Sequence, residues 1–92
     1  MAVSEIVHNA AASRFEAKLN AGIAVLEYRI EGSTIFMLHV EVPASEQGQG
    51  IAGRLTRMAL KFARDSGLSV SPRCPFIAAY VRRNPELLRP IG

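Results

Sequence analysis

The sequence predicts an α+β fold in the order β-β-β-α-β-α, with a mixed, mostly antiparallel sheet and a central helix. Residues 14–19 alternate strictly between apolar and polar side chains, and two short turns divide residues 14–42 into three strand-like segments, which is typical of an antiparallel meander. From residue 50 onward, apolar side chains recur at intervals of three and four, which indicates a helix. Because a helix connects the third and fourth strands, we expect those two strands to run parallel.

The meander consists of three predicted strands over residues 14–19, 23–30 and 34–42. The turns between them are Asn20-Ala21-Gly22 and Glu31-Gly32-Ser33, whose residue types favour chain reversal. The residues expected to face inward on the first two strands are Phe15, Ala17, Leu19, Leu26, Tyr28 and Ile30.

The third strand is expected to carry two ionisable side chains on one face. Residues two apart share a face of a strand, so His39 and Glu41 should point the same way. The opposite, apolar face would be made of Phe36, Leu38, Val40 and Val42.

The second half of the chain is predicted to be helical over residues 50–66, and Gly67 supplies the stop. A short strand follows over residues 68–72. Pro75 then opens a second helix, which runs to about Arg83. The apolar stripe of the first helix is Ile51, Leu55, Met58, Ala59, Phe62 and Ala63, and its basic stripe is Arg54, Arg57, Lys61 and Arg64.

A chain of 92 residues, 49% of them apolar, is expected to form one domain over residues 1–92 with an ordered core at about 14–88. Its longest apolar stretches are much shorter than the roughly 20 residues that cross a bilayer, and no signal peptide is recognisable. Cys74 is the only cysteine, so no internal disulfide forms. These features predict a cytoplasmic protein that does not bind membranes. We expect no metal.

Charge is unevenly distributed along the chain. Residues 1–53 have a net charge of −3 and residues 54–92 a net charge of +6. A basic C-terminal half suits an anionic partner, either a phosphorylated cofactor or nucleic acid, although it also fits an ordinary solvated surface.

The segment Gln47-Gly48-Gln49-Gly50-Ile51-Ala52 lies between a predicted strand and a predicted helix. Glycines there let main-chain N–H groups approach a ligand, and a helix N-terminus favours negative charge, so a pyrophosphate is the expected guest. A Walker A loop is excluded because no Gly-Lys-Ser/Thr follows. Gly48 to Gly53 matches the Rossmann pattern literally, but residues 68–73 contain no acidic residue to hold a ribose, and only one short strand remains.

Gln47-x-x-Gly50-x-Ala52 resembles the Q/R-x-x-G-x-G/A pyrophosphate loop of the GNAT acyltransferase superfamily. The segments His39-Val40-Glu41-Val42-Pro43 and Pro72-Arg73-Cys74-Pro75-Phe76 through Asn84-Pro85-Glu86 are similar to those of very short GNAT-like proteins. The resemblance covers roughly residues 14–88. It implies a minimal GNAT-like fold and an N-acetyltransferase that uses acetyl-CoA as co-substrate. The chain lacks the helical segment between the first two strands that helps form the family's acceptor site, so the amine acceptor is unknown.

The resemblance also implies which residues hold the coenzyme. The strand before the loop and the strand after its helix would splay apart around the pantetheine arm, and Glu41, Val42 and Pro43 would offer it main-chain hydrogen bonds. The pyrophosphate would lie on residues 47–52, and Arg54 or Arg57 would pair with a coenzyme phosphate. The predicted coenzyme-binding residues are therefore Glu41, Val42, Pro43, Gln47, Gly48, Gln49, Gly50, Ile51, Ala52 and Arg54.

Four residues are candidates for acting on the acetyl group. His39, with Glu41 beside it, would accept the amine proton, although a lone strand histidine is also commonly structural. Cys74 is expected at the N-cap of the second helix beside Arg73, where thiols gain reactivity, and is either an acetylated intermediate or an inert packed side chain. Tyr80 would protonate the departing thiolate or simply belong to the core. Direct transfer, the usual GNAT route, is the preferred mechanism.

Two other functions stay open. A CoA-binding or slowly hydrolysing protein without a true acceptor would also fit the missing segment. A small basic nucleic-acid-binding module is the other, but aromatic residues are few and do not alternate with the basic ones, which argues against it. The sequence identifies neither the acceptor nor the oligomeric state.

Overall fold

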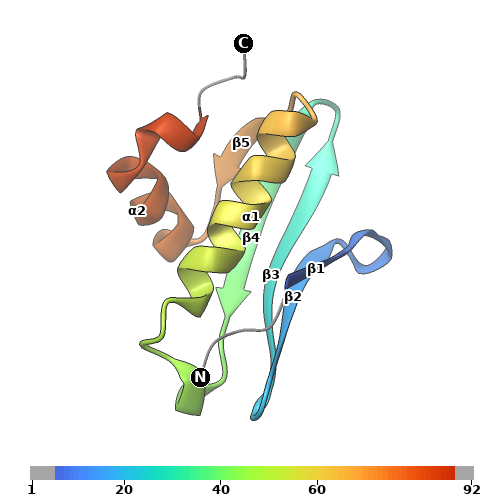
Figure 1. Ribbon diagram of the computed structural model, residues 1–92. Helices are drawn as coiled ribbons and strands as arrows, with labels where there is room; N and C mark the ends of the chain where they lie inside the picture. Colours follow the sequence, from blue (N-terminus) through green and yellow to red (C-terminus); the bar gives the residue numbers. More distant parts are fainter. Residues whose placement is uncertain (1–5, 89–92) are drawn as a thin grey trace.

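The computed structural model describes residues 6–88, which form one five-stranded sheet and two helices (Figure 1). The strands lie in the order β1-β2-β3-β4-β5; all neighbours are antiparallel except β4 and β5, which are parallel. The predicted α+β class and the mixed sheet are confirmed. The elements are β1 (Ile6–Asn9), β2 (Arg14–Leu19), β3 (Gly22–Glu31), β4 (Thr34–Glu41), α1 (Ile51–Asp65), β5 (Ser69–Pro72) and α2 (Pro75–Arg83), with 3-10 turns at Ala10–Ala12, Ala44–Glu46 and Pro85–Leu88.

Strand β1 is an addition to the predicted order and lies before the predicted ordered core. It pairs with β2 along the edge of the sheet. The His8 ring stacks on Phe15 with centroids 4.1 Å apart, and its Nε2 lies 2.5 Å from the Tyr28 hydroxyl. Burial raises the pKa of Tyr28. Strand β1 has only four residues and is joined to β2 by the turn Ala10–Ala12, so its sequence gives almost no strand signal. Tertiary contacts, which the sequence pattern does not show, define β1.

Both helices lie on the same face of the sheet. Helix α1 packs across β2, β3 and β4, and α2 lies beside α1 against β4 and β5 (Figure 1). In residues 6–88 no helix covers the opposite face, where His39 is 49% and Glu27 is 44% exposed at the side chain. The sheet thus has a packed face and a face open to solvent.

A β-bulge in β4 changes which side chains reach the packed face. Glu27 pairs with His39 but the next residue of β3, Tyr28, pairs with Met37, so Leu38 is left without a partner. The prediction that Phe36 and Leu38 share a face with Val40 is therefore wrong. Ile35 and Met37 are buried before the bulge, and Val40 and Val42 face the core side after it. The strand is apolar at nearly every position, so alternation could not reveal the extra residue.

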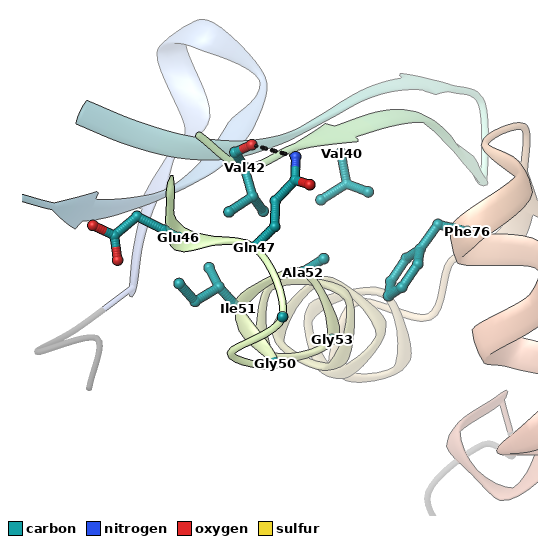
Figure 2. Close-up of a pocket in the computed structure, with 10 residues that line it drawn as sticks. Val40, Val42, Glu46, Gln47, Gly50, Ile51, Ala52, Gly53 and Phe76 are labelled. Atoms are coloured by element: carbon teal, nitrogen blue, oxygen red, sulfur yellow. Dashed lines mark hydrogen bonds between the residues drawn. The ribbon is translucent and has the colours of Figure 1, made fainter. Parts of the chain in front are cut away.

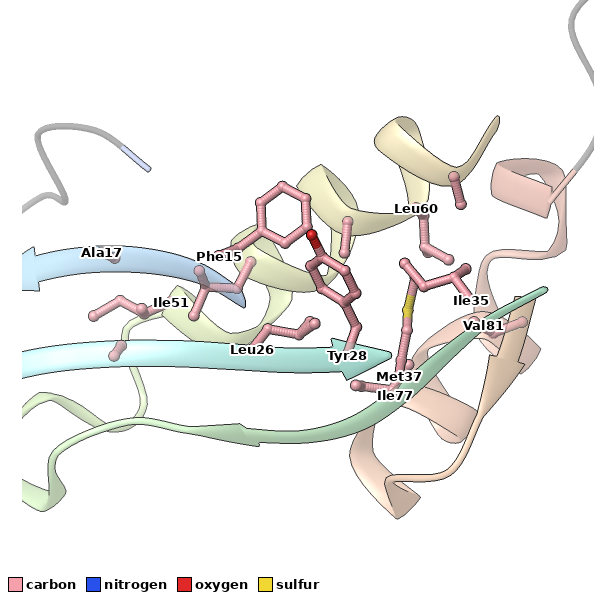
Figure 3. Packing of buried hydrophobic residues seen from close by; sticks show 14 residues of the cluster. Phe15, Ala17, Leu26, Tyr28, Ile35, Met37, Ile51, Leu60, Ile77 and Val81 are labelled. Atoms are coloured by element: carbon pink, nitrogen blue, oxygen red, sulfur yellow. The ribbon is translucent and has the colours of Figure 1, made fainter. Parts of the chain in front are cut away.

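The core fills the space between the sheet and the two helices (Figure 3). Ile30, predicted to face inward, is 40% exposed because it lies at the end of β3 beside the turn. Along α1 the stripe is rotated from the predicted one, since Met58 is 39% exposed and Thr56 and Leu60 are buried. The Thr56 hydroxyl is satisfied by donating to the Ala52 carbonyl at 2.8 Å. The buried apolar residues are Phe15, Ala17, Ala24, Leu26, Tyr28, Ile35, Met37, Ile51, Leu55, Ala59, Leu60, Ala63, Ile77 and Val81.

Candidate coenzyme cleft and catalytic face

The loop between β4 and α1 owes its shape to two glycines. Gly48 has φ 85° and Gly50, the N-cap of α1, has φ 79°. Both values lie in the left-handed region, which residues with a Cβ rarely adopt. These two conformations bring the chain from the turn Ala44–Glu46 into the first turn of α1.

The loop presents a series of main-chain N–H groups that have no main-chain partner. In the described part of the chain, none of the N–H groups of residues 48–53 donates a backbone hydrogen bond, and no side chain caps the start of α1. The first helical donor is Arg54, whose N–H lies 3.1 Å from the Gly50 carbonyl oxygen. Free N–H groups at a helix N-terminus carry partial positive charge and favour an anion.

A cavity of about 470 Å³ opens beside these N–H groups (Figure 2). Its walls come from the end of β4, from the loop and first turn of α1, and from α2, which contributes Phe76. Polar main chain on one side and apolar side chains on the other are typical of a site for a ligand with both kinds of surface. The lining residues are Val40, Val42, Glu46, Gln47, Gly48, Gly50, Ile51, Ala52, Gly53 and Phe76.

The Gln47 side chain ties the loop to the end of β4. Its Nε2 donates to the Val42 carbonyl oxygen at 3.1 Å, across the cavity wall (Figure 2). Its main-chain N–H donates to the Ala44 carbonyl oxygen at 3.3 Å. Gln47 therefore holds the loop in shape, and the unpaired donors belong to the residues after it.

The predicted coenzyme-binding residues divide into two groups. Those that line the cavity are Val42, Gln47, Gly48, Gly50, Ile51 and Ala52, whereas Glu41, Pro43, Gln49 and Arg54 lie outside its lining. Arg54 is exposed on α1 and borders a separate groove with Arg57 and Lys61. Four further lining residues were not predicted from the sequence: Val40, Glu46, Gly53 and Phe76.

Beside the cavity, the sheet opens between β4 and β5. Their parallel pairing ends at Met37 and Pro72, and the Arg73 N–H makes one further bond of 2.8 Å to the Met37 carbonyl oxygen. From there β5 gives way to α2, while β4 continues to Glu41. The stretch 38–41 of β4 therefore has no strand neighbour on this side, and its main-chain polar groups there lack a strand partner.

His39 and Glu41 do share the solvent-open face, as their spacing predicts. The His39 Nε2 lies 3.6 Å from Glu41 Oε1 and 3.8 Å from Glu27 Oε1, a neighbour that the sequence analysis missed. Cross-strand register was the only signal for Glu27, because it lies opposite His39 on β3. Arg14 Nη1 lies 3.9 Å from Glu27 Oε2. The side chain of Arg14 also donates a hydrogen bond to Glu16, and this bond, with a smaller contribution from the hydrogen bond of Asn9, lowers the pKa of the Glu16 carboxyl. None of these residues lines the cavity.

Cys74 and Tyr80 lie at the other side of the opening. Cys74 is the N-cap of α2, as predicted, and is half-buried without a capping hydrogen bond from its thiol. Within residues 6–88 it forms no hydrogen bond with His39. The Tyr80 ring stacks on Phe76 with centroids 6.1 Å apart, and its Cε1 lies 3.2 Å from where a Cβ on Gly53 would be. Gly53 thus allows Tyr80 to approach α1 closely, beside the cavity wall.

Residues 6–88 do not meet the requirements for a metal-ligand cluster or for a membrane-spanning helix. Residues 6–88 contain no group of three or more His, Cys, Asp or Glu residues placed to hold a metal ion. Over the same residues, no helix has both the length and the apolar character needed to span a bilayer.

Known proteins are similar to this chain over most of its length. The sequence profile of the GCN5-related N-acetyl-transferase family matches residues 14–90. Protein NATD1 of Gallus gallus is 36% identical over 84 residues, which is 88% of this chain and 76% of that protein. Protein NATD1 of Homo sapiens is 36% identical over 83 residues, 87% of this chain and 74% of that protein. The solution structure of a GCN5-like protein from Staphylococcus aureus has a TM-score of 0.75 and 20% identity, covering 100% of this chain and 94% of that one, so this likeness concerns the fold.

Proposed function

This chain belongs to the GCN5-related N-acetyltransferase family, and on that premise we propose that it binds acetyl-CoA in the cleft beside α1 and transfers the acetyl group to an amine. The observation that carries the proposal is the series of unpaired N–H groups over residues 48–53, next to a cavity of about 470 Å³. Pyrophosphate oxygens would accept from these N–H groups at the positive end of the α1 dipole.

The position of the pyrophosphate determines where the other parts of the coenzyme would lie. Its pantetheine arm would run along the free edge of β4 over residues 38–41, where the main chain has no strand neighbour. Val40, Val42 and Phe76 would provide apolar contact on the way. Arg54, exposed near the loop, would meet a coenzyme phosphate from outside the cavity. The thioester then emerges through the opening between β4 and β5 towards the solvent-open face.

Transfer requires an attacking amine, a base and an acid. The amine nitrogen attacks the thioester carbonyl carbon, the carbon–sulfur bond breaks, and coenzyme A leaves as a thiolate. His39 accepts the amine proton, directly or through a water molecule, and the carboxylates of Glu27 and Glu41 near its Nε2 stabilise the imidazolium that forms. The Tyr80 hydroxyl donates a proton to the thiolate. In this direct route Cys74, which lies at the N-cap of α2 and outside the cavity lining, would border the thioester without forming a bond to the acetyl group.

The fate of the acetyl group tests the proposal and separates it from its alternatives. Incubation with acetyl-CoA and a mixture of primary amines, followed by mass spectrometry of protein and small molecules, is expected to show N-acetylated amine and free coenzyme A. Acetate without acetylated amine would indicate a hydrolase, and bound coenzyme without turnover a binding protein.

The same measurement distinguishes the direct route from the covalent one. For direct transfer, Cys74→Ser should retain most of the turnover, and no acetyl group should remain on the protein when the amine is omitted. Tyr80→Phe should lower kcat more than it changes the KM for acetyl-CoA, as for a group that acts in the transition state. An acetylated Cys74 that forms and decays as fast as product appears would overturn the direct route.

A further inference from the structure

An aromatic side chain on the solvent-open face is flanked by two arginines. Phe36 of β4 points away from the packed face, since its neighbours Ile35 and Met37 are buried. The Cζ of Arg29, from β3, lies 5.7 Å from the centre of its ring, and the Cζ of Arg73, just after β5, lies 5.3 Å from it. Guanidinium groups at such distances are held by the ring quadrupole.

The two arginines differ in how their charge is balanced. Arg29 Nε forms an ion pair of 2.9 Å with Glu31. Arg73 has no carboxylate within 4.0 Å among residues 6–88; its Nε donates to the Ser71 hydroxyl at 3.1 Å. A neutral hydrogen-bond acceptor and an aromatic ring therefore orient a guanidinium group whose charge is not compensated. Such a group is prepared to bind an anion at a low entropic cost.

Arg73 is also close to the place where the acetyl group would emerge. Its main-chain N–H makes the last bond between the two strands, to the Met37 carbonyl oxygen, and the opening begins immediately beyond it. On the same face, Glu27 and Glu41 surround His39. Glu27 and Arg29 are two residues apart on β3, so their Cα atoms lie about 7 Å apart, and acidic and basic side chains occupy neighbouring parts of this face.

We propose that the acceptor is an amine that also carries an anionic group, which Arg73 binds while the amine lies at His39. This inference rests on the proposed function and specifies its substrate class. A ligand with an ammonium at one end and a carboxylate or phosphate at the other matches the two charged groups of this face. The side chain of Phe36, which Arg29 and Arg73 flank, would offer apolar contact to the chain that links the two ends.

Matched acceptors test the inference. The rate of acetyl transfer to 4-aminobutyrate is compared with that to butylamine, and the rate to 6-aminohexanoate with that to hexylamine. Within each pair the carbon chains are equally long, and only the amino acid carries a carboxylate. The amino acid of fitting length should have a kcat/KM about tenfold or more above that of its partner amine, a factor appropriate to a hydrogen bond between charged groups. Arg73→Gln should remove this preference by raising the KM for the amino acid, and should leave the values for the alkylamine unchanged.

Arg82→Gln is the matched control, because it removes an exposed arginine charge from α2, which lies on the other face of the sheet. It should keep the preference. Equal kcat/KM values within both acceptor pairs, or an unchanged preference in Arg73→Gln, would overturn the inference.

The experiment distinguishes a wrong acceptor class from the absence of acetyl transfer. If alkylamines and amino acids are acetylated equally, acetyl transfer stands and the anionic acceptor is wrong. If no amine is acetylated, the preference is measured instead as NMR-detected binding of 6-aminohexanoate and hexylamine to the CoA-loaded protein. Tighter binding of 6-aminohexanoate, lost in Arg73→Gln, would support the Arg73 site; equal binding would overturn it.

Discussion

Gly50→Asp is expected to abolish the rise in melting temperature that acetyl-CoA produces in the parent chain. A ligand at 100 times its Kd that binds only the folded state adds about 2.7 kcal/mol of stability. For a domain of this size, each kcal/mol corresponds to roughly 4–8 °C in Tm. The aspartate brings a negative charge to the N–H groups that would receive the pyrophosphate, and it places a Cβ at a φ of 79°. Thermal melts with and without acetyl-CoA measure the effect.

Gly32→Asp controls for the backbone strain and the added charge. Gly32 lies in the turn between β3 and β4, also has a positive φ, 60°, and has nothing within 4 Å of its would-be Cβ. This variant should lose some stability without ligand and keep the full acetyl-CoA shift. A full shift in Gly50→Asp as well would show that the loop does not bind the coenzyme.

His39→Ala is expected to lower kcat by about 10²–10⁴-fold, the usual contribution of a positioned general base, and to leave the Kd for acetyl-CoA unchanged. Its side chain is 49% exposed on the face that no described helix covers, so truncation removes little packing. Steady-state kinetics and isothermal titration measure the two quantities.

Lys18→Ala is a suitable comparison for His39→Ala, since Lys18 is exposed on β2, on the same face of the sheet. It should change neither kcat nor Kd. A His39→Ala variant with the kcat of the parent would assign His39 a structural role and leave the proton to another group.

The sequence predicted the parts of the fold that have strong local signals. Strict alternation over residues 14–19 gave β2, and Pro75 followed by Asn84-Pro85 gave the bounds of α2. Gly48 and Gly50 identified the loop, because glycines directly before a predicted helix indicate a tight turn with left-handed backbone conformations, and both residues have a positive φ. These signals depend on neighbours in sequence, which an amino-acid sequence records directly.

The rest depended on contacts between distant residues. The bulge at Leu38 comes from the register of β3 against β4, and it decides that Val40 and Val42, instead of Leu38, face the cavity side. Phe76 reaches the cavity only because α2 packs beside α1, where Gly53 leaves room for Tyr80. Neither local propensity nor spacing contains this information, so these features could not be predicted.

The binding of acetyl-CoA in the cleft beside α1 is tested most directly by mapping the amide chemical-shift changes that it causes in the ¹⁵N-labelled protein. The largest changes should fall on residues 48–53 and on the free edge of β4 over residues 38–41, with Phe76 also affected. The turn at Gly32 and the edge strand β1 should change little. Changes centred instead on the groove formed by Arg57 and Lys61, or no saturable change at all, would contradict the coenzyme site proposed for this protein.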